Sequence, residues 1–153
     1  MPQGIPKTVG ELMTRKVVTI SPSDTIAQIE EGMQRFRFRH MPVVEDGKLV
    51  GLVTHRDLLH ALSTTLSPVQ DQRNAIIRTQ PAHRIMQKDL VTVRPDEPLL
   101  SVANSMWDRK LGCVLITEER DALVGILTEA DFIRVVIKQI MGGHVPPAPS
   151  TRL

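Results

Sequence analysis

Two heptapeptides decide how this chain is built: GLVTHRD at Gly51–Asp57 and GILTEAD at Gly125–Asp131. Both are typical of an apolar strand that runs into a polar turn and then into a helix. Their surroundings repeat as well, because Met13 aligns with Met86 and the positions that follow keep that spacing of 73 residues, which becomes 74 at the heptapeptides. We interpret the pattern as an internal duplication with one insertion in a hairpin loop.

The composition is that of an ordinary globular chain, with 153 residues of which 41% are hydrophobic and 24% charged. Each half is too small to bury enough surface alone, so we expect the halves to pack together and on a second chain. A net charge of +2 without a polybasic run requires neither nucleic acid nor a membrane as partner. Because no apolar run is as long as a membrane span and no signal peptide is recognisable, we expect a cytoplasmic protein.

Each half shows the same order of periodicities: a short strand, a helix, a hairpin of two strands and a second helix. In the first half we expect a strand at Val17–Ile20, followed by a helix that Pro22, Ser23 and Asp24 begin. The apolar face of this helix is formed by Ile26, Ile29, Met33 and Phe36. Strands MPVVE and KLVGLVT, joined by Asp46-Gly47, and a helix from about Thr54 come next. The second half repeats this with LVTV, a helix around Pro98–Arg109, CVLIT, ALVGILT and a helix from Glu129 to about Met141. These patterns predict repeats at 8–64 and 79–141, a connector at 65–78 with a helix near Val69–Arg78, and an extended tail at 142–153.

The doubled β-α-β-β-α unit ending in G-h-h-T-x-x-D (h apolar) resembles a tandem pair of CBS domains, most fully over RHMPVVEDGKLVGLVTHRDLL at Arg39–Leu59. The resemblance covers about Thr8 to Ile140. It implies an α/β (α+β) fold of two tandem repeats packed sheet to sheet about a pseudo-two-fold axis. It also implies a regulatory module whose two clefts bind adenosine-containing ligands such as AMP, ADP, ATP or S-adenosylmethionine, with no cofactor required for its action.

The T-x-x-D motif has two interpretations. A Thr followed three residues later by an acid is a capping pair that satisfies the backbone N–H groups at a helix start. In the functional interpretation, which the doubled context favours, Asp57 and Asp131 accept hydrogen bonds from a ribose diol, and Thr54 and Thr128 contact the ligand. By the resemblance, apolar residues would line an adenine slot beside each motif: Val17, Val18, Leu52, Leu90, Val91 and Ile126.

The stretch RFRFRHMP provides the cations. Basic residues near the end of a helix also favour its dipole, which is a sufficient explanation for Arg35 and Arg37. By the resemblance, Arg39 and His40 reach the ligand's phosphates, and Arg56 helps. In the second half we align Leu111 and Gly112 with Arg39 and His40, and Glu129 and Ala130 with His55 and Arg56, so we expect the two sites to differ in their affinity for phosphate.

Other functions are less well supported by the sequence. No motif of a hydrolase, a phosphate-binding loop or a zinc protease is present, His55 and His60 are poorly spaced for a metal, and Cys113 lies in an apolar strand, so we expect neither an enzyme nor a metal site. The alternatives are a ligand-free dimeric scaffold and a nucleic-acid-binding protein that uses RFRFRH, although aromatic residues make up only 3% of the chain. The apolar helices DLLHALSTTL and DFIRVVIKQIM favour a homodimer, and we expect the output to act in trans on an effector protein that the sequence does not identify.

Overall fold

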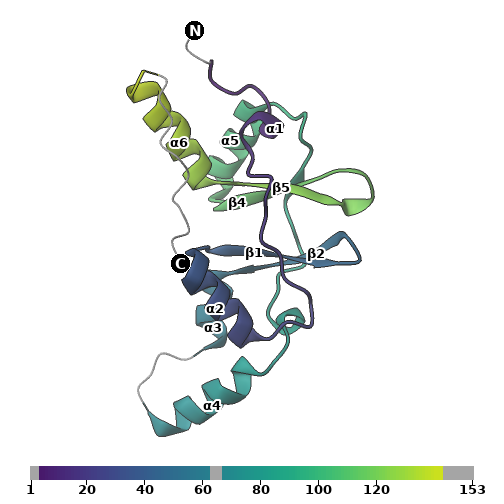
Figure 1. The fold of residues 1–153 in the computed structure, drawn as a ribbon, viewed down its shortest axis with the longest axis vertical. Helices are drawn as coiled ribbons and strands as arrows, with labels where there is room; N and C mark the ends of the chain where they lie inside the picture. Colours follow the sequence, from purple (N-terminus) through teal and green to yellow (C-terminus); the bar gives the residue numbers. More distant parts are fainter. Residues whose placement is uncertain (1–3, 63–66, 143–153) are drawn as a thin grey trace. The chain divides into compact units, whose positions relative to one another are not determined.

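The computed structural model describes residues 4–62 and 67–142, which form two compact units (Figure 1). Among these residues, one unit combines 4–17 with 91–142, and the other consists of 18–62 and 67–90. In chain order the elements are α1 (Val9–Leu12), α2 (Ile26–Phe36), β1 (His40–Glu45), β2 (Lys48–Thr54), α3 (His55–Ala61), α4 (Pro68–Arg78), η1 (Ala82–Arg84), β3 (Thr92–Val93), α5 (Leu99–Arg109), β4 (Cys113–Thr117), η2 (Glu119–Asp121), β5 (Leu123–Thr128) and α6 (Glu129–Ile140). The predicted α/β class is confirmed.

The sheet of the 18–90 unit is the antiparallel hairpin of β1 and β2. Its two-residue turn has φ values of 50° at Asp46 and 78° at Gly47, as the Asp-Gly pair predicts for a tight hairpin whose twist matches the strands. The expected strand at Val17–Ile20 is wrong except at its last residue, because only Ile20 forms a bridge, in parallel with Val43. The chain passes from one compact unit to the other between Val17 and Val18, so this segment reaches β1 only at its end.

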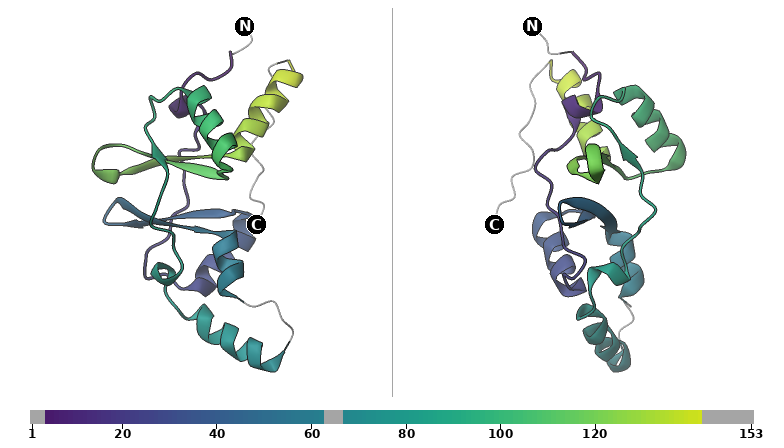
Figure 2. Two further views of the ribbon diagram at one scale, coloured as in Figure 1. Left: turned by 180° about the vertical axis from the view of Figure 1, so that it is seen from behind. Right: turned by 90° about the vertical axis from the view of Figure 1, so that its right-hand side faces the viewer.

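Helices α2 and α3 cover one face of this hairpin (Figures 1 and 2). Three of the four predicted apolar residues of α2, Ile26, Ile29 and Met33, lie in the core with side chains from both strands. The fourth, Phe36, is only half-buried and stacks on Phe38 instead. The helix start differs from the prediction, because the cap is Thr25: the Gln28 N–H donates to Thr25 Oγ1 at 3.2 Å, and the Thr25 N–H donates to Gln28 Oε1 at 2.8 Å. Asp24 instead stabilises the preceding turn by accepting from the Ser21 N–H at 2.7 Å.

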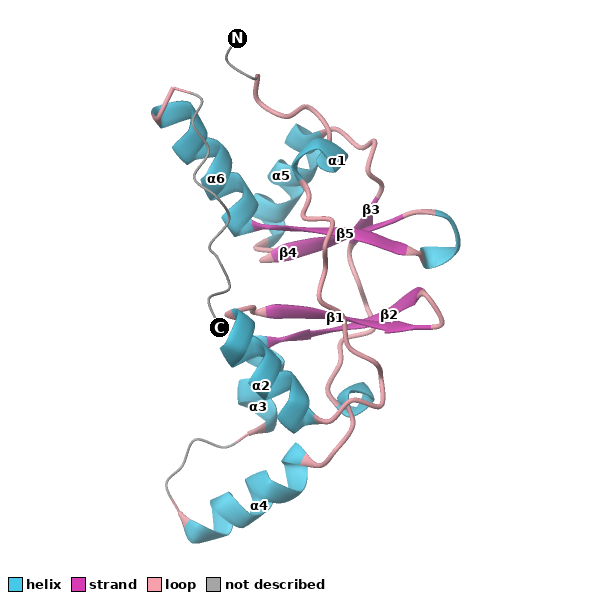
Figure 3. Cartoon of the chain, viewed as in Figure 1, coloured by secondary structure: helices cyan, strands magenta, loops and turns pink. Residues whose placement is uncertain are grey.

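The other unit contains a sheet in the order β3-β4-β5, with β3 parallel to β4 and β4 antiparallel to β5 (Figure 3). Of the expected strand LVTV, only Thr92 and Val93 pair. The connection between β4 and β5 is longer than the turn of the first hairpin and contains η2, which accounts for the predicted insertion. Helices α5 and α6 cover the sheet, and the short helix α1, which the sequence analysis missed, contributes Val9 and Leu12 to the core.

Each unit is completed by a segment from the other repeat, which we call its arm. Arm residues Thr14 and Gln87 occupy matching places in the duplication, and Thr14 forms a bridge with Ile126 whereas Gln87 forms one with Leu52. The compact units therefore differ from the predicted repeats at 8–64 and 79–141, because each arm belongs to one repeat by sequence but packs in the unit of the other. The repeat boundaries stay a prediction.

The arms explain the glycine that begins each heptapeptide. A Cβ at Gly51 would lie 2.5 Å from Sδ of Met86, and one at Gly125 would lie 2.5 Å from Sδ of Met13. Both distances are far below van der Waals contact, so the methionine of each arm packs where no side chain fits. Close packing is thus a sufficient reason for the repeated glycine.

The helix expected in the connector is confirmed as α4, which Ser67 caps by accepting from the Gln70 N–H at 3.2 Å. Arg78 at its end donates to Glu30 of α2 through Nε at 2.7 Å, and this hydrogen bond raises the pKa of the guanidinium above its ordinary value. The ion pair joins α4 to α2 within the 18–90 unit. The predicted tail at 142–153 lies outside the described residues except for Gly142.

Candidate functional site

The first T-x-x-D motif lies where β2 ends and α3 begins. The Thr54 N–H and hydroxyl both donate to Asp57 Oδ2 at 2.8 Å, and the Asp57 N–H donates to Thr54 Oγ1 at 3.2 Å. This is a complete capping box, so the capping interpretation is confirmed for this copy. The cap does not use the whole carboxylate, because Oδ1 of Asp57 takes no part in it and the residue is partly exposed.

The arm adds a contact that sequence reasoning missed. Gln87 donates from Nε2 to both carboxylate oxygens of Asp57, at 3.1 Å to each. The backbone of Gln87 also pairs with Leu52 in both directions, at 2.8 and 3.0 Å, which fixes the arm beside the motif. The duplication contained a signal, because Gln87 aligns with Thr14, and both residues turn out to contact a motif aspartate.

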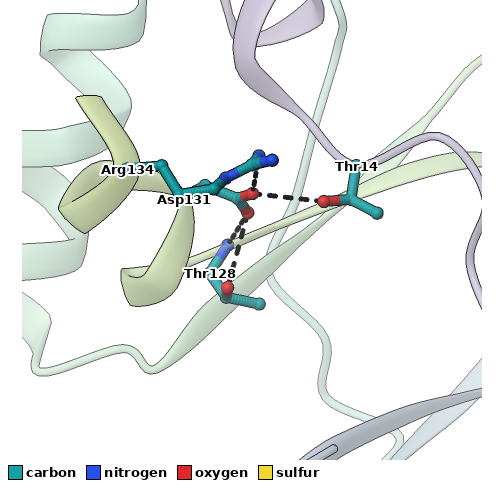
Figure 4. Close-up of polar contacts among 4 residues, drawn as sticks. All are labelled: Thr14, Thr128, Asp131 and Arg134. Carbon is teal, nitrogen blue, oxygen red and sulfur yellow. Dashed lines mark hydrogen bonds and ion pairs between the residues drawn. The ribbon is translucent and has the colours of Figure 1, made fainter. Parts of the chain in front are cut away.

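At the second motif, Figure 4 shows the carboxylate of Asp131 in contact with Thr128, Thr14 and Arg134. The Thr128 N–H donates to Asp131 Oδ2 at 2.8 Å, and the hydroxyl of Thr128 lies 3.4 Å from the same oxygen. On the other side of the carboxylate, Oδ1 accepts from Thr14 Oγ1 at 3.1 Å and from Nη2 of Arg134 at 2.6 Å. Asp131 is only 4% exposed, so an ionised side chain is buried here with its partners.

The predicted cations gather at the first motif. His40 pairs with Thr54 across the hairpin, and the carbonyl of Arg39 accepts from the His55 N–H at 2.8 Å. Arg39 and Arg56 are both exposed at this end of the hairpin. The sequence therefore brings two guanidinium groups and one partly exposed carboxylate to the same end of a single unit.

A shallow hollow of about 400 Å³ adjoins this motif and is lined by Arg56, Asp57, His60, Ala61 and Ile85. Four of these residues come from α3, and Ile85 follows η1 on the arm side. The hollow gives the carboxylate of Asp57 access from solvent. It also places His60 near the motif, one helical turn beyond Asp57.

One predicted alignment is wrong by a single residue. His40 pairs with Thr54 as Cys113 pairs with Thr128, and the His55 N–H donates to Arg39 as the Glu129 N–H donates to Gly112. The residues that correspond to Arg39 and His40 are therefore Gly112 and Cys113, not Leu111 and Gly112. Burial raises the pKa of the Cys113 thiol to about 12, so it bears no charge near neutral pH, and the second motif lacks the cations of the first.

The predicted adenine-slot residues are core or half-buried side chains. Leu52 and Ile126 are buried and pair with the arms, whereas Val18 and Val91 are half-buried against the cores of their units. The compact units bring together Val18 with Leu52, and Val91 with Ile126. Val17 belongs to the same unit as Ile126, and Leu90 to the same unit as Leu52. The ligand role of all six side chains stays a prediction.

The basic stretch RFRFRH folds partly on itself. The rings of Phe36 and Phe38 are stacked with centroids 5.7 Å apart, and the guanidinium of Arg35 lies 5.6 Å from the Phe36 ring. Arg37 ends α2 with a left-handed backbone. Stacking with nucleic-acid bases would have to compete with these contacts, so they argue against the nucleic-acid interpretation.

Residues 4–62 and 67–142 contain neither a metal-binding cluster nor a membrane-spanning helix. No cluster of three or more His, Cys, Asp or Glu side chains in these ranges could hold a metal ion. No helix in the same ranges has the length and apolar character needed to cross a membrane.

Comparison with known proteins gives a family match over most of the chain. The family model described as CBS domain matches residues 9–64 and 82–138. Among solved structures, the fold is similar to a Vibrio cholerae protein assigned to acetoin utilization, with a TM-score of 0.76 and 29% identity over 90% of this chain and 95% of that one.

Two similar structures contain ligands with an adenosine moiety. The CBS domain pair of protein MJ0100, in complex with 5-methylthioadenosine and S-adenosyl-L-methionine, has a TM-score of 0.69 and 25% identity over 84% of this chain and 98% of that one. The cytosolic domain of the Mg²⁺ channel MgtE, in complex with ATP, has a TM-score of 0.64 and 26% identity over 84% of this chain and 48% of that one.

Several curated relatives are much longer than the matched region. A homoserine O-acetyltransferase of Methanococcoides burtonii is 30% identical over 130 residues, which are 84% of this chain but 24% of that protein. In the first four such relatives the match spans 24–46% of their length.

Proposed function

The chain belongs to the CBS domain family and contains two copies of that domain in tandem, and on this premise we propose that it is a regulatory module that binds an adenosine-containing nucleotide and acts in trans on a partner protein. The proposed ligands are AMP, ADP, ATP and S-adenosylmethionine. Support comes from the relatives of this fold that are complexed with ATP or with S-adenosyl-L-methionine.

The observation that carries the proposal is the arrangement of charges at the first motif. Asp57 provides a carboxylate that is partly open to solvent, and a carboxylate is the group that accepts hydrogen bonds from a ribose diol in other nucleotide sites. Arg39 and Arg56 lie at the same end of the hairpin and supply the charge-assisted donors that phosphate oxygens prefer. One end of one unit thus combines groups for both the sugar and the phosphate of a nucleotide.

Calorimetric titration with AMP tests this proposal. Since a hydrogen bond to a charged group contributes roughly 1.5–3 kcal/mol, Asp57→Ala should weaken AMP binding by about tenfold or more. The substitution also removes a helix cap, so Gln28→Ala is the matched control: it breaks the capping box of α2 without touching the motif. AMP affinity that is the same in wild type, Asp57→Ala and Gln28→Ala would leave Asp57 with a capping role alone.

The same titration separates binding from a ligand-free scaffold. A folded chain that binds neither AMP, ATP nor S-adenosylmethionine up to millimolar concentrations would favour the scaffold, and the nucleotide proposal would then fail. Single-stranded DNA, titrated at two salt concentrations, tests the remaining alternative, because binding through phosphates weakens steeply with salt.

We also propose a homodimer formed through α3 and α6. Helix α6 packs on its own core with Phe132 and Val135, whereas Ile133, Val136 and Ile140 are between 56% and 79% exposed. These three residues recur at helical spacing on a neighbouring face of the helix, and such an apolar stripe is typical of a contact surface. Leu59 of α3 is also half exposed.

The proposed output is a contact with an effector protein in the cytoplasm rather than a reaction. The relatives that are named as enzymes extend well beyond the matched region, so their activities are not transferred to this part of the chain. Affinity capture with and without AMP, followed by identification of the bound protein, tests the output directly. A set of bound proteins that AMP does not change would argue against regulation.

A further inference from the structure

The two T-x-x-D motifs differ in what their aspartates can still accept. We infer that Arg134 closes the second motif, so that a nucleotide bound by this chain is held through Asp57 and not through Asp131. The inference deepens the function proposed above and rests on it. It assigns a specificity-determining role to Arg134, which the sequence analysis did not consider.

The carboxylate of Asp131 is fully occupied. An ionised carboxylate has about four lone-pair sites, two on each oxygen. In the second motif four donor groups surround it: the N–H and hydroxyl of Thr128 at Oδ2, and the side chains of Thr14 and Arg134 at Oδ1. With 4% of the residue exposed, a ribose hydroxyl can reach Asp131 only by displacing one of these groups.

Displacement of Arg134 is unfavourable for an electrostatic reason. Its Nη2 lies 2.6 Å from Asp131 Oδ1 in an ion pair whose acidic side chain is only 5% exposed. Separating a charged pair at a buried site leaves an uncompensated charge, and a neutral hydroxyl does not replace it. A guanidinium stays charged at any pH that the folded protein tolerates, so neutralisation of the arginine does not release this contact.

The carboxylate of Asp57 retains capacity. Its Oδ2 is used by the cap. Among residues 4–62 and 67–142, its Oδ1 accepts from the Nε2 of Gln87 alone, and this donor is shared between the two oxygens. That amide carries no charge, so a ribose hydroxyl can replace it without separating an ion pair. Asp57 also lines the hollow described above, which Asp131 does not.

The duplication itself identifies the residue responsible. The spacing of 74 residues that relates Asp57 to Asp131 relates His60 to Arg134. His60 is exposed and lines the same hollow as Asp57, and in the described part of the chain no hydrogen bond joins these two side chains. The difference between the open and the closed motif therefore follows from an imidazole in one repeat and a guanidinium in the other.

The stoichiometry of AMP binding to the full chain, measured by calorimetry and native mass spectrometry, tests the inference. We expect about one AMP per chain, an affinity that Asp57→Ala lowers about tenfold or more, and an affinity that Asp131→Asn leaves unchanged within about twofold. Arg134→Met should open the second motif and raise the stoichiometry toward two, with adenosine as a second probe because the cations of the first motif are missing there. Arg73→Met, which replaces an exposed arginine of α4 outside both motifs, is the matched control and should keep one site.

Three results would each overturn the inference. The first is a stoichiometry of two AMP per chain in wild type. The others are a loss of affinity in Asp131→Asn equal to that in Asp57→Ala, and a single site in Arg134→Met. Wild-type protein that binds neither AMP, ATP nor S-adenosylmethionine would overturn the proposed function instead. In that case the closing contact is tested by melting temperatures: Asp131→Asn and Arg134→Met should each lower the melting temperature, and the double variant should lower it no further than the more harmful single one. Additive losses would show that the two side chains do not act as a pair.

Discussion

Replacing Gly125 with alanine should destabilise the protein by forcing apart β5 and the arm that packs on it. The new Cβ would lie 2.5 Å from Sδ and 3.0 Å from Cγ of Met13, and 3.2 Å from the carbonyl oxygen of Thr14. The thioether could turn away, but the carbonyl is held by the Ile126 N–H at 3.0 Å. Overpacking of a filled core costs about 1–3 kcal/mol, and the fixed carbonyl places this substitution in the upper half of that range.

Such a loss corresponds to a fall in melting temperature of about 4–12 °C for a chain of this size, measurable by circular dichroism or by urea denaturation. Gly4→Ala is the control, because a Cβ at Gly4 would have no neighbour within 4 Å. Met13→Ala should cost about 2–5 kcal/mol through the cavity it leaves. In that background, Gly125→Ala should cost clearly less than in wild type, because only the close contact with the Thr14 carbonyl remains. Full stability of Gly125→Ala, or strict additivity with Met13→Ala, would refute the packing of the arm on this glycine.

Three further predictions concern charge and assembly. Because burial raises the pKa of the Cys113 thiol to about 12 from an ordinary value of 9.0, the folded state keeps a proton that the unfolded chain loses, and stability should fall by up to about 1.4 kcal/mol per pH unit above pH 9. Denaturation of Cys113→Ala should lack this alkaline loss. Ile133→Asp and Val136→Asp should each convert a dimer to a monomer in light scattering, and a wild-type monomer at micromolar concentration would contradict the dimer. Arg39→Gln should weaken AMP binding about three- to tenfold and leave adenosine binding unchanged, whereas equal losses for both would mean that Arg39 only supports the fold.

Local signals in the sequence predicted most of the elements. Helical spacing of apolar residues located α2, α5 and α6, and Asp46-Gly47 located the hairpin turn, since these patterns depend on neighbours close in the chain. The start of α2 was misplaced because several residues before Ile26 are good helix starters, and only the reciprocal bonds of Thr25 and Gln28 decide between them. The strand at Val17–Ile20 was wrong because its pairing depends on where the chain crosses between units.

The candidate site was predicted in part for the same reason. The pairing of Thr54 with Asp57 follows from their separation of three residues, and so does the contact of Asp131 with Arg134, which the helical spacing of the two residues could have indicated. The contacts of Gln87 and Thr14 could not be predicted in this way. They join residues 30 and 117 positions apart, and no local periodicity reports such a pairing.

The exchange of arms also affects the order in which the chain can fold during synthesis. Residues 18–90 are continuous, so this unit can close as soon as its own arm has left the ribosome. The N-terminal arm is made earlier, but its partner Ile126 and the aspartate that Thr14 contacts are made much later. Met13 is an apolar side chain that is buried in the folded protein. During synthesis it therefore lacks its packing partners until the other unit has been translated. The N-terminal arm is therefore buried later than the 18–90 unit, although it is synthesised before that unit.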